Sequence, residues 1–423
     1  MRFNERFYER ESRAHYWLFI IIPVAFIMRL WWVLNVHTAP VYDFLKYHLG
    51  AVSIVEGNGY KLYGNPTAFE PIGYPGFLAL LYKIFGTRLI FPKLANIVLS
   101  LGIVILTYLL GKKLFNRATG VLAAAFIAFS PRNITYTSVL CTEIFFTFFL
   151  LLAIYLLLQF RDRKWSGQVI GILCGILALT KPANLLFPGV LFFLAWLEGK
   201  SFSQAFKKTI VIGLFMALTI LPWTIRNYIV FNKFIPISTN GGITLYLNNN
   251  PYAKGAWQDP FSFPNSPLAP YKNEETGFWD ELAVDKLGKE LGTKWILENP
   301  GEFFKLGFKK LYYVFSDSWD VSFAVENLTS GGPMPNRGWV YKTAKWAYWG
   351  LLGALAFYLI MLVRGFLAGK KLGNHLVLWL PVLFFCATYF VFEGQPRYIF
   401  PMLPLFVIMA AWGLQSIKKT ASY

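Results

Sequence analysis

Residues 142–164 read TEIFFTFFLLLAIYLLLQFRDRK, an apolar run with an acidic start and a basic end. A helix needs roughly 17–25 predominantly apolar residues to cross the hydrocarbon core of a bilayer. Glu143 stands at the beginning of this run, and Arg161, Arg163 and Lys164 follow its end. The stretch therefore predicts a transmembrane helix whose two ends lie in different surroundings.

Apolar runs of this kind recur from residue 16 to residue 417 of the 423-residue chain, which is 56% hydrophobic and only 15% charged. The first run lacks a small-residue cleavage site, so we interpret it as a span and not as a signal peptide. We predict an all-α polytopic membrane protein of about ten crossings, centred near residues 26, 100, 124, 151, 174, 190, 214, 354, 383 and 407. The third and fifth are short, which indicates tilting or continuation into the next turn.

Basic residues beside the predicted spans set the orientation, because loops rich in Lys and Arg stay in the cytoplasm. Six such segments all fall on one side. They hold Arg2, Arg6, Arg10 and Arg13; Lys112, Lys113 and Arg117; Arg161, Arg163 and Lys164; Lys200, Lys207 and Lys208; Arg364, Lys370 and Lys371; and Lys418 and Lys419. Ten crossings then return both termini to the cytoplasm.

Three regions follow from this topology. Residues 1–221 hold seven spans and a first outer loop at 37–88, residues 222–341 form a long outer loop, and residues 342–423 hold three spans. Residues 131–143, 181–184 and 393–397 also lie outside.

Short amphipathic segments in the outer loops predict interfacial helices. The stretch from Gly73 to Phe85 is too short to cross a membrane. In the long loop, Val284, Leu287, Leu291 and Trp295 share one helical face. After a break at 299–301, a second face holds Phe304, Phe308, Leu311 and Phe315, with Lys305 and Lys309 elsewhere. That spacing fits a helix lying among lipid head groups, and ordinary packing onto the bundle is the alternative.

Composition excludes several classes of function. The net charge of +18 comes mostly from clusters beside spans, as membrane topology requires, so nucleic-acid binding is not indicated. Cys141, Cys174 and Cys386 have no paired spacing, and no residue pattern requires a metal. The chain has no nucleotide-binding loop or serine-nucleophile motif. No acid lies inside a span to carry proton or sodium coupling, so any chemistry belongs to the outer surface and needs a lipid-carried donor.

Asp43 is the first candidate catalytic residue. A lone acid in an outer loop is most often solvated or a helix cap. Tyr47 follows one helical turn later, and the loop returns through Gly57–Asn58–Gly59–Tyr60 and Glu70–Pro71–Ile72–Gly73–Tyr74–Pro75, whose glycines and prolines suit a pocket wall. A carboxylate near a low-dielectric boundary can have a raised pKa and act as a general base toward a hydroxyl.

Two further charges flank the same outer face. Glu143 could simply complement the dipole at the start of its helix. Arg29 lies well inside the first span, where a guanidinium is costly unless it is paired. A phosphate of a lipid head group would supply such a partner.

Cations also occur at the outer ends of other spans, namely Lys93, Lys181, Arg226 and Arg397. Simple anchoring at the interface explains most such residues. Lys181 is the stronger candidate because it lies in a tight turn with Pro182 after it.

Ordered motifs run nearly from end to end of the chain. They are Arg29–Leu30–Trp31, Asp43 with Tyr47, 57–60, 71–82, 142–146, Thr180–Lys181–Pro182, 222–228, 238–242 with 249–251, and Pro396–Arg397–Tyr398. In this order the chain resembles the GT-C membrane glycosyltransferases that use polyprenyl-phosphate sugars. The most similar branch holds bacterial relatives of protein O-mannosyltransferases and of the lipid A aminoarabinose transferase.

The resemblance implies roles for individual residues. Asp43 and Glu143 match the two active-site carboxylates, and Arg29, Lys181 and Arg397 fall at positions for the donor phosphate. We place Tyr47, Glu70, Tyr74, Arg226 and Tyr398 in the substrate pocket. Relatives often carry a basic residue and two prolines where this chain has Glu70–Pro71–Ile72, so the resemblance leaves open how the donor phosphate is held there.

We therefore expect a glycosyltransferase that moves a sugar from a polyprenyl-monophosphate donor to an envelope acceptor on the outer face, with inversion implied by the resemblance. No cofactor is expected. The acceptor can be a lipid, a polymer or a protein hydroxyl. The alternative is a flippase or permease for a lipid-linked sugar, which would share the outer cations but would not need Asp43.

Overall fold

The computed structural model describes residues 14–197, 199–273, 275, 277–316, 320–321, 338–369 and 372–420. Several residues used above lie outside this part of the chain, namely Arg2, Arg6, Arg10, Arg13, Lys370 and Lys371, and so does most of 317–337 in the long outer loop. The side chains of Lys418 and Lys419 are likewise outside the description.

Helices occupy all ten predicted crossing positions. Seven are long and apolar enough to span a membrane: α2 (Leu18–Asn35), α5 (Ile90–Leu114), α8 (Thr142–Gln159), α11 (Phe202–Phe231), α16 (Gly338–Leu367), α17 (Gly373–Val391), and the continuous pair η5 (Pro396–Met402) and α18 (Leu403–Thr420). Three shorter apolar helices occupy the remaining positions: α6 (Arg117–Phe129), α9 (Ser166–Thr180), and η3 (Pro182–Leu186) running into α10 (Phe187–Leu197). The predicted polytopic all-α class is confirmed.

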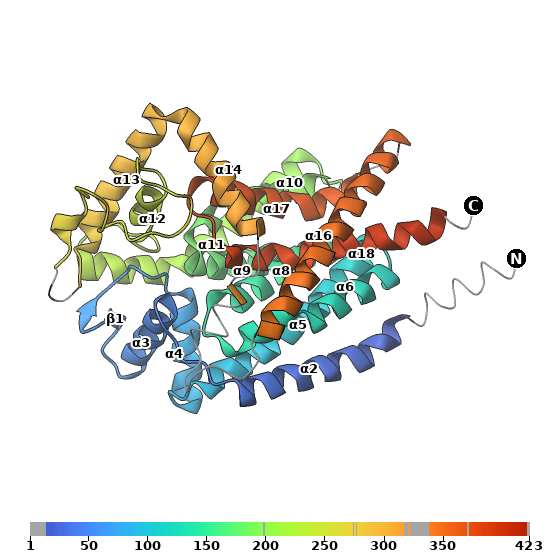
Figure 1. The fold of residues 1–423 in the computed structure, drawn as a ribbon, viewed down its shortest axis with the longest axis horizontal. Coiled ribbons are helices and arrows are strands. Elements are labelled where there is room, and N and C mark those ends of the chain that lie inside the picture. Colours follow the sequence, from blue (N-terminus) through green and yellow to red (C-terminus); the bar gives the residue numbers. More distant parts are fainter. Residues whose placement is uncertain are drawn as a thin grey trace, which may run out of the picture.

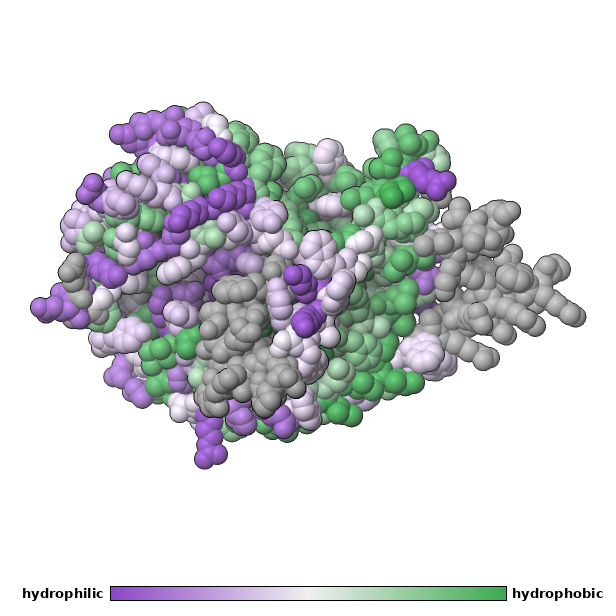
Figure 2. Space-filling view, in the orientation of Figure 1, coloured by the Kyte–Doolittle hydropathy of each residue, from purple (hydrophilic) through white to green (hydrophobic). Residues whose placement is uncertain are grey.

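The spans form one bundle, and the segments predicted to lie outside the membrane gather at one end of it (Figure 1). The start of α2 and the end of α18 lie at the opposite end of that bundle. Hydrophilic residues crowd the surface at the end that holds α12, α13 and α14, whereas a hydrophobic surface covers the spans (Figure 2). This distribution is typical of a multi-pass membrane protein with a polar cap.

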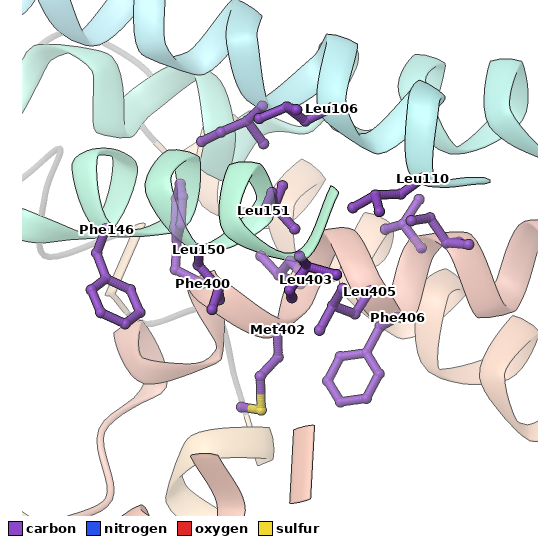
Figure 3. Close-up of a cluster of buried hydrophobic side chains, with 14 of the residues drawn as sticks. Leu106, Leu110, Phe146, Leu150, Leu151, Phe400, Met402, Leu403, Leu405 and Phe406 are labelled. Carbon is purple, nitrogen blue, oxygen red and sulfur yellow. The ribbon is translucent and has the colours of Figure 1, made fainter. Parts of the chain in front are cut away.

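Two helices form the centre of the bundle. About two thirds of α8 and a larger share of η5–α18 are buried, whereas α2, α11 and α16 are mostly exposed to the surroundings. Side chains from α5, α8 and η5–α18 meet in the core, including Leu106, Phe146, Leu150 and Met402 (Figure 3). The central position of α8 fixes where Glu143, in its first turn, can lie.

Small residues bring α5 and α6 close together. A Cβ on Gly111 would lie 2.9 Å from the Cα of Gly120, and one on Gly120 would lie 2.6 Å from the carbonyl oxygen of Tyr108. Membrane helices use such residues to approach closely, because packing contacts replace the hydrophobic driving force there. The Asn116 side chain begins α6 by accepting a bond from the backbone N–H of Thr119 at 2.8 Å.

The predicted short third span is confirmed. The 13 residues of α6 rise about 20 Å, less than the hydrocarbon thickness of about 30 Å. After Ser130 the chain continues as α7 (Pro131–Thr135) and η2 (Tyr136–Ser138), both buried in the protein.

The first outer loop contains two short helices. The first, α3 (Asp43–Val55), leads into a small hairpin of β1 (Lys61–Leu62) and β2 (Asn65–Pro66), paired antiparallel with Lys61 opposite Pro66. The second, α4 (Gly73–Phe85), has the bounds predicted for a helix too short to cross. It buries Tyr74, Leu78 and Tyr82 against α3 and its neighbours.

Where the structure describes the predicted long outer loop, it folds around α12 (Gly241–Leu247), α13 (Glu281–Glu298) and α14 (Pro300–Ser316), with the short η4 (Ala269–Tyr271) between α12 and α13. Val284, Leu287 and Leu291 of α13 pack together as predicted.

On α14 the predicted shared face divides. Leu311 and Phe315 pack on the bundle, whereas Phe304 and Phe308 are 57% and 67% exposed. Gly307, Lys310 and Val314 are the buried residues instead, so α14 is anchored to the bundle and still presents aromatic side chains outward.

Candidate active site

Acidic and basic side chains from five separate segments meet at the polar end of the bundle. They come from the first turn of α3, the loop before α4, the first turn of α8, the turn between α9 and η3, and η5. We call this set the charge cluster: Asp43, Lys46, Glu70, Glu143, Lys181 and Arg397. Asp43 and Arg397 are 354 residues apart in sequence and still form an ion pair.

Asp43 begins α3, where the free backbone N–H groups of a helix start favour a carboxylate. The preceding Tyr42 has a φ of 51°, rare for a residue with a side chain, which turns the chain into the helix. One carboxylate oxygen lies 3.4 Å from Arg397 Nη2 and the other 3.4 Å from Lys46 Nζ. The side chain remains 39% exposed, so a substrate can reach it.

The charges around Asp43 give it a different pKa shift from the one that the sequence suggested. Burial by itself raises the pKa of Asp43, but the positive charges of Arg397 and Lys46 outweigh burial and hold that pKa below its usual value. The expectation that the membrane boundary raises the pKa of Asp43 is therefore wrong for this arrangement of charges. Asp43 is an ionised carboxylate between two cations.

Glu70 is the acid with a raised pKa. Its side chain is only 6% exposed, and burial raises its pKa to about 7, with the nearby Asp43 adding to the rise and Lys46 opposing it. Lys46 Nζ lies 3.4 Å from a Glu70 oxygen. The Tyr60 hydroxyl donates to the Glu70 backbone carbonyl at 3.1 Å and fixes the loop.

Lys46 is the functional candidate that the sequence prediction missed. It bridges Asp43 and Glu70, and its ammonium also lies 5.0 Å from the centroid of the Phe69 ring. Relatives of the predicted family often carry a basic residue where this chain has Glu70, and here α3 supplies a cation from a different segment. The i, i+3 spacing from Asp43 was the available signal, although such pairs are common on any helix surface.

Glu143 and Lys181 form the inner part of the cluster. Glu143 is 2% exposed, its oxygen lies 3.6 Å from Lys181 Nζ, and the Thr142 hydroxyl lies 3.4 Å from its other oxygen. Lys181 also lies over the rings of Phe146 and Tyr398, at 5.6 and 5.4 Å. Glu143 can complement the dipole of α8 and also belong to the site. It lies in the first turn of that helix and next to the cation Lys181.

Arg397 and Tyr398 enter the cluster from η5. The Arg397 guanidinium lies between the rings of Phe44 and Tyr398, each 5.6 Å away, and its Nε is buried without a hydrogen-bond partner. The Tyr398 hydroxyl donates to Glu393 at 2.9 Å. An unsatisfied buried N–H on a cationic guanidinium suits an anionic ligand.

Glu393 is a second residue that the prediction did not assign. It is 6% exposed and accepts hydrogen bonds from Gln395, at 2.6 Å, and from Tyr398. Burial raises its pKa, and the bonds from Gln395 and Tyr398 and the charge of Arg397 oppose the rise only in part. Glu393 therefore holds the Tyr398 hydroxyl group in place through this hydrogen bond.

Tyr47 and Tyr74 form the wall next to the cluster. Their rings meet edge to face, with centroids 5.6 Å apart. Tyr74 is fully buried, and its hydroxyl has no hydrogen-bond partner. Tyr47 lies beside the charge cluster, and Tyr74 packs against it from within the wall.

Arg226 lies away from the charge cluster and holds the first outer loop. Its guanidinium donates to the carbonyls of Thr67 and Tyr60, each at 2.8 Å, and lies 4.7 Å from the Trp223 ring centroid. Glu281 of α13 also holds this loop, because its carboxylate accepts a hydrogen bond from the backbone N–H of Ala68 at 3.1 Å. The contacts of Arg226 thus favour a supporting role over the substrate contact that we predicted.

Arg29 is structural in this fold. Its guanidinium is completely buried and donates to Ser100 Oγ at 2.8 Å and to the carbonyls of Ala128 and Ile127 at 2.8 and 3.2 Å. The helix bond to Ile127 would come from the N–H of residue 131, but Pro131 has none. Arg29 replaces the missing donor at the end of α6, so no surface remains for the phosphate that we predicted there.

Among the described residues, no group of three or more His, Cys, Asp and Glu side chains could hold a metal ion. The arrangement can bind an anion through Arg397, Lys46 and Lys181, and it presents one accessible carboxylate, Asp43, next to those cations. Such a set can hold a phosphate and accept a proton beside it.

Comparisons with known proteins bear on the family and on the fold. Residues 70–225 match the family described as dolichyl-phosphate-mannose-protein mannosyltransferase. No curated protein was found with significant sequence similarity.

Among solved structures, the oligosaccharyltransferase AglB of Archaeoglobus fulgidus, in complex with an inhibitory peptide and a dolichol-phosphate, aligns with a TM-score of 0.55 and 15% identity, covering 96% of this chain and 51% of AglB. The same enzyme tethered to an acceptor peptide gives 0.52 and 14%, covering 96% and 50%. ArnT from Cupriavidus metallidurans bound to undecaprenyl phosphate gives 0.47 and 13%, covering 96% and 78%. The chain thus spans about half the length of AglB. The resemblance to GT-C membrane glycosyltransferases is confirmed at the level of the fold.

Proposed function

We propose that this chain transfers a sugar from a polyprenyl-monophosphate donor to a hydroxyl group of an envelope acceptor on the outer side of the membrane. The observation that carries the proposal is the position of Asp43, accessible at the polar end of the bundle and held between Arg397 and Lys46. The family match over residues 70–225 supports a glycosyl transfer reaction. The basic loops at the opposite end of the bundle support an outward-facing site.

The donor phosphate would lie between Arg397 and the two lysines of the cluster. Arg397 has a buried Nε without a partner, and its planar guanidinium suits phosphate oxygens. Lys46 and Lys181 supply further charge from α3 and from the turn after α9. The polyprenyl tail would extend between the spans, where an apolar chain is stable.

Donor binding would also activate Asp43. Without a donor, Arg397 and Lys46 stabilise the Asp43 carboxylate and make it a weak base. A phosphate that takes over these two cations as its own partners reduces their hold on Asp43, so the pKa of Asp43 rises and the carboxylate becomes a better proton acceptor. The donor therefore binds before Asp43 becomes an effective base.

The transfer step follows from these positions. The acceptor oxygen attacks the anomeric carbon, the bond between that carbon and the phosphate oxygen breaks, and the electron pair leaves with the polyprenyl phosphate. Asp43 takes the hydroxyl proton, and Arg397 with the lysines stabilises the charge on the departing phosphate. Attack opposite the leaving group inverts the anomeric configuration. Glu143 keeps Lys181 charged and in place through their ion pair.

Asp43→Asn tests the proposal, with transfer of labelled sugar to envelope acceptors as the measurement. Loss of a general base costs about 10²–10⁴-fold in rate, so we expect at least a hundredfold loss. Glu56→Gln, which removes an exposed acid from the end of the same helix, is the matched control. Full transfer by a normally folded Asp43→Asn variant would overturn the catalytic assignment.

The same experiment separates the flippase alternative. A protein that only moves a lipid-linked sugar across the membrane would keep donor translocation in the Asp43→Asn variant and would form no glycosylated product in a purified system. Formation of product by the purified wild-type chain from a polyprenyl-phosphate sugar would exclude that alternative.

A further inference from the structure

A groove lies at the opposite end of the bundle from the charge cluster, between α2 and the pair α5 and α6. It has a volume of about 590 Å³, within the range of about 300–1,000 Å³ usual for ligand sites. The first two turns of α2 line one side, with Phe19 and Ile22 among their apolar residues. Tyr108 and Lys112 of α5 and Arg117 of α6 line the other side.

The two sides of this groove differ in chemistry. The α2 side is entirely apolar, and Phe19 is 74% exposed. The opposite side carries two cations, with Lys112 Nζ 5.9 Å from the centroid of the Tyr108 ring. No acidic side chain lines the groove among the described residues. The site therefore suits a molecule with an apolar chain and a negatively charged head.

The position along the spans points to the same class of ligand. Lys112 in the last turn of α5 and Arg117 at the start of α6 belong to a basic segment that the charge pattern assigns to the cytoplasmic membrane surface. Apolar residues of α2 continue from that level into the hydrocarbon region, and α2 runs beside α5 along the bundle (Figure 1). Basic pockets between spans at this level attract the head groups of anionic lipids.

We propose that this groove binds an anionic phospholipid, with its phosphate between Lys112 and Arg117 and one acyl chain along the first turns of α2. The occupant is distinct from a donor bound at the charge cluster. Asn96 of α5 donates to the Val139 carbonyl at 2.9 Å, close in sequence to Glu143 of the charge cluster, and the chain from Asn96 to Tyr108 of the groove rises about 18 Å along the helix axis. The proposal is independent of the proposed function, because it concerns only lipid binding.

Native mass spectrometry of the purified full chain in detergent tests the proposal, with phosphatidylglycerol or phosphatidylcholine of identical acyl chains as the added lipid. We expect wild type to retain phosphatidylglycerol preferentially. The double variant Lys112→Gln/Arg117→Gln should lose at least about tenfold in phosphatidylglycerol affinity while keeping its phosphatidylcholine affinity. The control Lys113→Gln/Lys164→Gln removes two exposed cations from the same end of the bundle and should change either affinity less than about twofold.

A second pair of variants tests the apolar half of the groove without changing charge. Ile22→Trp places a large side chain in the groove and should reduce retention of both lipids. Ile27→Trp changes a lipid-exposed position of the same helix outside the groove and should leave retention unchanged. Equal phosphatidylglycerol preference in wild type and the Lys112/Arg117 variant, an equal loss in the charge control, or unchanged retention in Ile22→Trp would each overturn the proposal.

Discussion

Lys46 places its ammonium group 3.4 Å from Glu70, a buried acid 24 residues further along the chain. The same ammonium lies 3.4 Å from Asp43, so one cation joins the accessible acid to the buried one. Glu70 stands where relatives of the resembling family often have a basic residue. The charge that is missing from the sequence motif is restored in space by α3.

Replacing Lys46 should weaken donor binding more than acceptor binding. Lys46→Gln removes one of the cations proposed to contact the donor phosphate, and charge-assisted bonds of this kind contribute about 1.5–3 kcal/mol. We expect the KM for the donor to rise at least about tenfold, with a smaller change in the KM for the acceptor. Lys83→Gln, an exposed cation on α4, is the matched control. Equal increases in both KM values would contradict the phosphate role.

The buried carboxyl group of Glu70 predicts a pH-dependent stability difference. Its folded-state pKa is raised to about 7, from an ordinary value near 4.5, mainly by burial. The stability that the protonated acid contributes is present below about pH 4.5 and is lost as the pH rises through about 7. Glu70→Gln cannot ionise, so its Tm relative to wild type should increase between pH 5 and pH 8. Thermal unfolding in detergent measures this, with the exposed Glu56→Gln as control, and a constant or decreasing difference would refute it.

Arg397 should set the acid limit of the pH–activity profile. Asp43 must be ionised to accept a proton, and Arg397 helps to hold the pKa of Asp43 below its usual value. Arg397→Gln removes that charge, so the pKa of Asp43 rises and activity should fall at a higher pH on the acid side. The measurement is kcat/KM against pH for wild type and variant. An unshifted acid limb, with activity merely reduced, would mean that Arg397 does not control the base.

The sequence predicted the membrane part of the fold well because length and apolar content decide it. The bounds of α4 could be predicted because its apolar stretch is too short to cross a membrane and is bordered by prolines and a glycine. Asp43, Glu143, Lys181 and Arg397 are single charges in sequence, and their convergence depends on which helices pack against each other. No local pattern shows that α3 approaches Glu70, which is why Lys46 was missed.

Arg29 shows why a buried charge can be misassigned from sequence. A cation inside a span does require partners, and that part of the reasoning holds. The partners are carbonyls at the end of α6, left without donors where Pro131 interrupts the helix bonds. The sequence signal for an internal partner of Arg29 was the Ser130–Pro131 step at the end of a short apolar run.

Removing the Arg29 guanidinium should therefore affect stability and not donor affinity. Arg29→Leu leaves the carbonyls of Ile127 and Ala128 buried without donors, at a cost of about 1–3 kcal/mol for each group. We expect a clear decrease in Tm and an unchanged KM for the donor in the folded fraction. Arg88→Leu, which removes an exposed arginine from the loop before α5, should leave Tm nearly unchanged. A raised donor KM at normal Tm would return Arg29 to the phosphate site.

Lys310 should anchor α14 to the segment that leads to Arg397. The Lys310 side chain is completely buried and donates to Asn249 Oδ1 at 3.0 Å, to the Val391 carbonyl at 2.9 Å and to the Phe390 carbonyl at 3.2 Å. Gly394 fits directly against the Lys310 backbone, because a Cβ there would lie 2.0 Å from the Lys310 carbonyl oxygen.

Burial lowers the pKa of Lys310 to about 7 from an ordinary value of 10.5. The neutral side chain's contribution to the stability of the fold is therefore fully present above about pH 10.5 and is lost as the pH falls through 7. Lys310→Met lacks this dependence and removes the Lys310 bonds to Asn249 Oδ1 and to the Phe390 and Val391 carbonyls, of which the Val391 carbonyl keeps a bond from Asn249 Nδ2 at 3.0 Å. We expect its Tm to be lower than that of wild type, with a deficit that grows from pH 7 to pH 9. Lys309→Met, the exposed neighbour on the same helix, is the control. A deficit that shrinks as the pH rises would show that Lys310 is charged in the folded protein, and its three bonds would then belong to a buried ammonium ion.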